Sequence, residues 1–123
     1  MDKFQIKDSN NLRDIVTEGL IDGKALDLKV FNVRSLTTIA DFMVIATGSS
    51  SRQVKALSQR VSVIVKAAGY PILGIEGEVG HEWVLVDAGD VLVHIMHPET
   101  RDFYQLERLW EGYAQNQDDL GVS

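Results

Sequence analysis

Three histidines are the residues of this sequence whose types suggest metal binding most directly. His94 and His97 lie three positions apart in a segment predicted to be a strand, so their side chains point to opposite faces and cannot hold one ion together. His81 precedes the neighbouring predicted strand, and the chain has no cysteine to complete a set of ligands. The sequence therefore predicts no metal and no cofactor.

Acidic pairs are the next candidates, as general acids and bases. Asp87 and Asp90 flank a predicted turn, while Glu76 and Glu78 lie in a predicted loop, and neither pair has a geometry that recommends it for proton transfer. The sequence contains no Gly-x-Ser-x-Gly or Ser-x-x-Lys motif, which would mark a nucleophile. We therefore expect a protein that is not an enzyme.

A serine-rich turn, Gly48-Ser49-Ser50-Ser51, joins a predicted strand to a predicted helix. Backbone amides at a helix start can hold an anion, but a phosphate-binding loop needs a Lys before its Ser or Thr, and none stands here. The helix that follows, 52–68, contains no acidic residue to hold catalytic metal ions. We interpret the serines as a helix cap and keep a diverged, nucleotidyltransferase-like nucleotide-binding enzyme as the alternative function.

The elements that would position these residues alternate between helices and strands. Apolar residues recur at helical spacing over 12–20, after the candidate caps Ser9, Asn10 and Asn11, and again over 54–68. Strands are predicted over 26–32, 42–47, 71–75, 82–87 and 91–97, and a last helix over 100–113. This order predicts an α/β fold in a single domain, residues 9–114, with a mixed five-stranded sheet flanked by helices. Flexible termini are expected at 1–8 and 115–123.

Charge and hydropathy restrict the partners. The formal net charge is −6, with 12 basic and 18 acidic residues, so little direct contact with nucleic acid is expected. An acidic surface suits a basic protein partner instead. No apolar stretch is long enough to cross a membrane, and the first residues lack the apolar run of a signal peptide, so we expect a cytoplasmic protein.

The last two strands carry an unusual face. A two-residue turn at Ala88-Gly89 predicts that Trp83 faces His94, with Met96 diagonal to Trp83. One face of this hairpin is then aliphatic and must be core, and the other carries Trp83, Leu85, Leu92, His94 and Met96. The mixed face is either core beneath the last helix or a partly exposed binding patch, and both readings remain open. Trp is enriched in binding hot spots, and Met suits adaptable surfaces.

Several blocks of residues, in this order, resemble one known family. The blocks are Asp41-Phe42-Met43, Thr47-Gly48-Ser49-Ser50-Ser51-Arg52-Gln53-Val54, Gly74-Ile75-Glu76-Gly77, Trp83-Val84-Leu85-Val86-Asp87-Ala88-Gly89-Asp90-Val91, Val93-His94-Ile95-Met96 and Tyr104-Gln105-Leu106-Glu107-Arg108-Leu109-Trp110. No single block is specific, but together they resemble the ribosomal silencing factor family, also called Iojap or RsfS. The resemblance covers residues 11–110.

The resemblance implies a nucleotidyltransferase-like α/β fold without catalysis. It also implies binding to the large ribosomal subunit through large-subunit ribosomal protein number fourteen. Occupying that site sterically blocks joining of the ribosomal subunits and represses translation under starvation or in stationary phase.

The family's contact surface matches Trp83, Met96 and Tyr104 of this chain, with Glu82 and Arg101 as polar neighbours. His94, which shares the predicted face of Trp83, completes the expected ribosomal-protein interface. A further hypothesis has a second copy covering this apolar face, which would make the free protein a homodimer.

Overall fold

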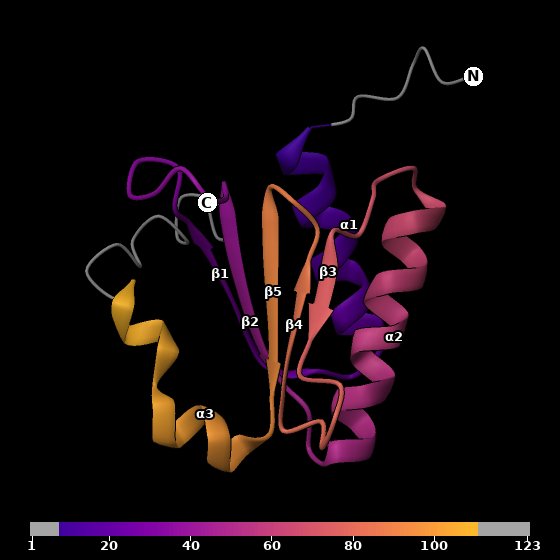
Figure 1. Ribbon diagram of the computed structural model, residues 1–123, viewed down its shortest axis with the longest axis vertical. Coiled ribbons are helices and arrows are strands. Elements are labelled where there is room, and N and C mark those ends of the chain that lie inside the picture. The colour runs from indigo at the N-terminus through magenta and orange to yellow at the C-terminus, as the bar shows by residue number, and fades with distance from the viewer. Residues whose placement is uncertain (1–7, 111–123) are drawn as a thin grey trace.

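A five-stranded mixed sheet forms the centre of the molecule (Figure 1). The structure, a computed structural model, describes residues 8–110. Its strands are β1 (Leu26–Asn32), β2 (Phe42–Thr47), β3 (Gly74–Glu76), β4 (Trp83–Asp87) and β5 (Val91–Met96), in the spatial order β1-β2-β5-β4-β3. Within residues 8–110, β2 and β5 pair in parallel, while the other neighbouring strands pair antiparallel. The predicted mixed sheet is confirmed.

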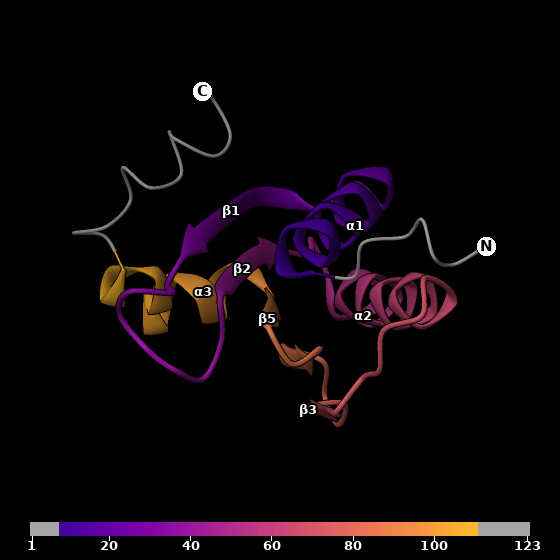
Figure 2. The ribbon, with the colours of Figure 1, turned by 90° about the horizontal axis from the view of Figure 1, so that it is seen from above.

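Helices lie on both faces of this sheet, as predicted. Two long helices, α1 (Ser9–Asp22) and α2 (Ser51–Ala67), lie side by side on one face (Figure 2). The short helix α3 (Pro98–Tyr104) and the single 3₁₀ turn η2 (Leu106–Leu109) lie on the other. The order of helices and strands along the chain is the predicted one.

The main core lies between the sheet and the α1–α2 layer. All six residues of β2 are buried, which confirms the predicted central strand. The aliphatic face of the β4–β5 hairpin also faces this core and is fully buried there, as predicted: Val84, Val86, Val91, Val93 and Ile95. Burial of these aliphatic side chains away from water is the main force that holds the helices on the sheet.

The helix caps agree with the sequence in part. Ser50 caps α2 and accepts a hydrogen bond from the backbone N–H of Gln53 at 3.1 Å, and Gly23 is the C-cap of α1. The cap of α1, however, is Asp8 and not one of residues 9–11, which already belong to the helix. The Asp8 carboxylate accepts from the backbone N–H of Asn11 at 2.8 Å, which satisfies an amide that the helix leaves free.

The C-terminal helix differs from its prediction. A single helix over 100–113 was expected, but α3 ends at Tyr104, because Gln105 adopts the left-handed conformation with a φ of 48°. The chain then turns back as η2, which brings Leu106 and Trp110 onto the sheet. Residues 111–113 lie outside the described part of the chain. Strand β3 is also shorter than expected and begins at Gly74.

Two further expectations concern the chain termini and a membrane-spanning segment. The expected flexible termini lie outside residues 8–110, except for Asp8. Within that range, no helix has the length and apolar character needed to cross a bilayer.

Candidate functional site

The β4–β5 hairpin places Trp83 and its neighbours, and its register differs from the prediction by two residues. The two central residues of the turn are Gly89 and Asp90, and the backbone N–H of Ala88 donates to the carbonyl of Val91 at 3.0 Å. Gly89 has a φ of 87°, a conformation that a tight hairpin turn requires and glycine adopts freely. Trp83 therefore faces Met96 and lies diagonal to His94, the reverse of the predicted pairing. A shift of two residues preserves the faces, so the predicted grouping of side chains is correct.

The mixed face of the hairpin is core in its centre and exposed along one side. Met96 and Ile45 are fully buried in a second, smaller core, against which Trp83, Leu106 and Trp110 pack while partly buried. The chain beyond α3 therefore covers the centre of this face. The sequence left open whether this face is core or a partly exposed patch, and each of these two interpretations describes a part of the face.

Along that side lies an aromatic patch, which consists of the partly buried Trp83 and the exposed Phe103, Tyr104 and Leu109. The ring of Tyr104 lies 4.9 Å from that of Trp83, and the ring of Phe103 packs edge-on against Tyr104, also at 4.9 Å. Phe103 is 78% exposed and Tyr104 56% exposed. A hollow of about 380 Å³ opens beside Trp83 and is lined by Tyr104, Gln105, Leu106, Arg108 and Leu109. Exposed aromatic rings beside an apolar hollow are typical of a protein-binding surface.

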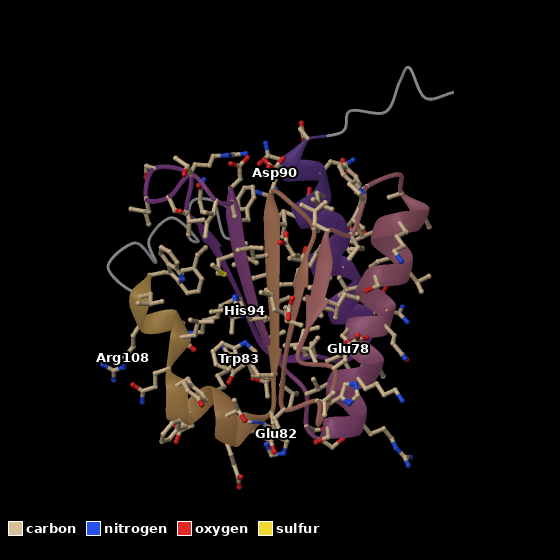
Figure 3. All side chains as sticks on the ribbon, in the orientation of Figure 1. Glu78, Glu82, Trp83, Asp90, His94 and Arg108 are labelled. Atoms are coloured by element: carbon tan, nitrogen blue, oxygen red, sulfur yellow. The ribbon has the colours of Figure 1, made fainter. Side chains whose placement is uncertain are left out.

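Beneath the patch, His94 fixes the orientation of Trp83. The indole Nε1–H of Trp83 donates a hydrogen bond of 2.9 Å to Nδ1 of His94, and both side chains lie on the side of β5 that faces α3 (Figure 3). Burial lowers the pKa of His94 to about 4, so the imidazole is neutral at neutral pH. Because Nδ1 accepts, the ring proton sits on Nε2. The pair holds the indole ring in one orientation.

Arg101, expected at the interface, is instead buried at 7% exposure. Its Nη1 donates to the backbone carbonyl of Asp27 at 2.6 Å and to the hydroxyl of Thr47 at 2.8 Å. Its Nε and Nη2 bind the carboxylate of Glu107 at 3.1–3.3 Å. This guanidinium therefore makes its contacts inside the protein.

The six expected interface residues thus fall into two groups. Trp83, Tyr104 and Glu82 have surface to offer a partner, and the backbone carbonyl of Glu82 also accepts from the N–H of His97 at the start of α3. Met96, His94 and Arg101 are buried and support the patch from below. The interface itself stays a prediction.

Two members of the patch, Phe103 and Leu109, were missed by the sequence reasoning. Phe103 falls within the single helix expected over 100–113, and nothing in that expectation singles it out, whereas in the structure its side chain is 78% exposed near the end of α3. One large apolar residue next to Tyr104 in the sequence is only a weak indication of an exposed binding surface. No pattern local to this segment marks the residue where the helix breaks.

Two backbone amides of the serine-rich turn, those of Gly48 and Ser49, donate within the chain, the first to the carbonyl of Met96 at 3.0 Å. The backbone N–H of Ser49 donates to the side-chain oxygen of Gln53, and the N–H of Gln53 donates to Ser50. The interpretation as a helix cap is confirmed. In residues 8–110, no three side chains of His, Asp or Glu come close enough to hold a metal ion.

Fold and site define a small α/β protein with one sheet and an aromatic patch beside its C-terminal helix. The family model described as "Ribosomal silencing factor during starvation" matches residues 6–122, and the chain belongs to this ribosomal silencing factor family. It is 43% identical over 111 residues to the ribosomal silencing factor of Zymomonas mobilis, covering 90% of this chain and 83% of that protein.

Two further comparisons extend this similarity. A crystal structure of a Chromobacterium violaceum protein superposes with a TM-score of 0.83 at 45% identity, covering 85% of this chain and 87% of that one. The mouse protein named "Mitochondrial assembly of ribosomal large subunit protein 1" is 33% identical over 100 residues, which are 79% of this chain and 44% of that protein. The predicted family and fold are confirmed.

Proposed function

We propose that this chain binds the large ribosomal subunit through large-subunit ribosomal protein number fourteen and sterically blocks joining of the ribosomal subunits. Translation is thereby repressed under starvation or in stationary phase. Membership of the silencing-factor family supports this proposal, as does the name of the mouse relative, which refers to the large subunit. The protein acts as a binding factor and not as an enzyme.

The observation that carries the proposal is the contact between the partly buried Trp83 and the exposed Tyr104. Their rings contact each other at 4.9 Å, and Trp83 is held from below by His94. Rigid aromatic side chains lose little conformational entropy on binding, so a patch that is ordered before the encounter favours affinity. Trp and Tyr are also the residues that most often dominate binding energy.

The charge of the chain supports a basic partner. A formal net charge of −6 complements ribosomal proteins, which are mostly basic, and complementary charge accelerates association. Glu82 lies next to the patch with its side chain exposed. We propose that Trp83 and Tyr104 contact the ribosomal protein with Glu82 at their edge, while Met96, His94 and Arg101 hold the contact surface in shape.

Mixing experiments with purified ribosomal subunits test the proposal directly. The protein is titrated into large subunits before small subunits are added, and full ribosomes are measured by sedimentation. We expect a dose-dependent loss of full ribosomes with the wild type and a much weaker effect with Trp83→Ala. Val79→Ala is the matched control, because Val79 is 98% exposed and lies outside the patch. Unchanged joining at saturating wild-type protein would refute the proposal.

The partner and the competing functions need separate measurements. Calorimetry with isolated large-subunit ribosomal protein number fourteen should show binding that Trp83→Ala weakens. Calorimetry with nucleoside triphosphates and magnesium should show none, since the backbone amides of Gly48 and Ser49 already donate within the chain. Sedimentation of the free protein at several concentrations tests the proposed homodimer.

A further inference from the structure

Arg101 joins parts of the chain that lie far apart in the sequence. One guanidinium group binds the start of β1 through the Asp27 carbonyl, the end of β2 through Thr47, and η2 through Glu107. The planar fork of arginine suits this task, since it offers five N–H groups in fixed directions, and four of them suffice for these contacts. A lysine ammonium would reach only part of the set.

The backbone of β1 is locally distorted at Asp27, whose carbonyl accepts this hydrogen bond. Asp27 adopts a φ of 47°, which is unfavourable for a residue with a side chain, and the pairing of β1 with β2 shifts register between Leu26 and Lys29. The distorted strand presents its carbonyl to Nη1 of Arg101 at 2.6 Å. Strained backbone of this kind persists only where surrounding contacts hold it, and here the guanidinium supplies one.

The buried anchor of α3 on the sheet is a polar side chain. The structure describes every residue of α3 and η2, and Arg101 is the one among them that is buried. Apolar side chains of this segment contribute as well, since Leu106 packs partly buried on the second core. The orientation of α3 therefore depends strongly on a polar contact, which is directional, rather than on apolar burial alone.

The position of α3 also sets the position of Tyr104 in the aromatic patch. Tyr104 follows Arg101 by three residues at the end of the same short helix, and the N–H of Gln105 donates to the carbonyl of Arg101 at 2.8 Å where the chain turns back. The Tyr104 ring then lies against Trp83, which is fixed by His94. A rotation of α3 would therefore move the Tyr104 ring relative to Trp83.

We propose that Arg101 is a positioning residue, which locks α3 and η2 onto the sheet so that Tyr104 stays against Trp83 and the aromatic patch is preformed. It acts through Tyr104 and does not touch the partner. The partner's identity rests on the function proposed above, whereas the preformed patch is a property of the free protein.

The free protein gives the first test. In wild type, the Tyr104 ring protons and the Trp83 indole N–H should show NMR shifts typical of closely packed rings. Arg101→Met should move both toward the positions of a separated pair, and Arg101→Lys should recover part of the shift. Arg60→Met is the matched control, because Arg60 also binds a backbone carbonyl, Gly19 at 3.0 Å, but between α1 and α2 on the other face. Unchanged Tyr104 shifts in Arg101→Met would overturn the proposal, whatever the ribosome experiments show.

Binding to large subunits gives the second test, as a double-mutant cycle. Arg101→Met should weaken co-sedimentation at least about tenfold in the wild-type background and hardly at all in the Tyr104→Ala background. Equal losses in both backgrounds would mean direct contact with the partner and would overturn the proposal. Glu107→Gln is the second variant if Arg101→Met does not fold, since it keeps a hydrogen-bond acceptor and removes the charge. Glu107→Gln should change the NMR shifts of the Tyr104 ring protons in the same direction but by a smaller amount. Unchanged Tyr104 shifts would again count against the proposal.

Discussion

Trp83 and His94 form a diagonal pair across the β4–β5 hairpin, joined by the 2.9 Å hydrogen bond from indole Nε1 to imidazole Nδ1. Their rings lie 5.9 Å apart and tilted, so the contact is a hydrogen bond at the ring edges rather than a stack. The geometry leaves one face of Trp83 for Tyr104. One half-buried indole therefore connects the buried second core to the exposed patch.

Removing the indole should weaken binding to the large subunit. We expect Trp83→Ala to cost about 2 kcal/mol or more, which is roughly a thirty-fold loss of affinity, because the variant loses the central ring of the patch. Co-sedimentation with large subunits at increasing protein concentration measures the loss. Val79→Ala should bind as the wild type does. A folded Trp83→Ala protein with wild-type affinity would contradict the assignment of the patch.

The buried imidazole should make stability depend on pH. Since the pKa of His94 in the folded protein, about 4, lies below the ordinary histidine value of 6.5, the unfolded chain binds a proton between these pH values and the folded chain does not. The free energy of unfolding should therefore fall as the pH drops from about 6.5 to about 4, by up to about 3 kcal/mol. Urea denaturation at pH 7, 5.5 and 4.5 measures this slope.

The matched variant for that experiment is His94→Asn, which offers Trp83 an acceptor but does not titrate. Other groups contribute to the slope equally in both proteins, so the difference between the two slopes belongs to His94. We expect the wild type to lose more stability than the variant on acidification. Parallel slopes would show that His94 does not carry the effect.

Glycine at position 77 should be required for the backbone that precedes β4. A Cβ added to Gly77 would lie 2.0 Å from the carbonyl oxygen of Trp83, and its φ of 88° is unfavourable for other residues. We expect Gly77→Ala to cost about 3 kcal/mol or more and to weaken subunit binding by displacing Trp83.

Gly80→Ala is the control for that substitution. Gly80 has a φ of 86° but no atom within 4 Å of an added Cβ, so only the backbone penalty of about 1 kcal/mol is expected. Thermal denaturation and co-sedimentation separate the two variants. Equal effects of both would mean that the clash with Trp83 is relieved at little cost.

The cap of α1 should contribute to stability without affecting the patch. Asp8→Ala removes the acceptor for the Asn11 amide and should cost about 1 kcal/mol, while Asp8→Asn should cost less because it keeps an oxygen acceptor. Urea denaturation measures both. Large-subunit binding should be unchanged in each variant, since α1 lies on the other face of the sheet from Trp83.

Much of the fold was predictable because its signals are local. Side chains alternate along any strand and recur every 3.6 residues along any helix, so the buried residues of β2 and α2 leave a pattern within a few residues. The same alternation correctly grouped Trp83, His94 and Met96 on one face. The order of elements and the family resemblance follow from patterns of this kind.

The geometry of the candidate site depends on contacts that leave no local pattern. The hairpin register depends on which residues form the turn, and the end of α3 depends on how Leu106 and Trp110 reach the second core. Arg101 reads in the sequence as an ordinary surface arginine, yet it binds Asp27 and Thr47, residues 74 and 54 positions away. Its burial follows from three segments meeting in space, and the short-range periodicity of the sequence carries no information about such a meeting.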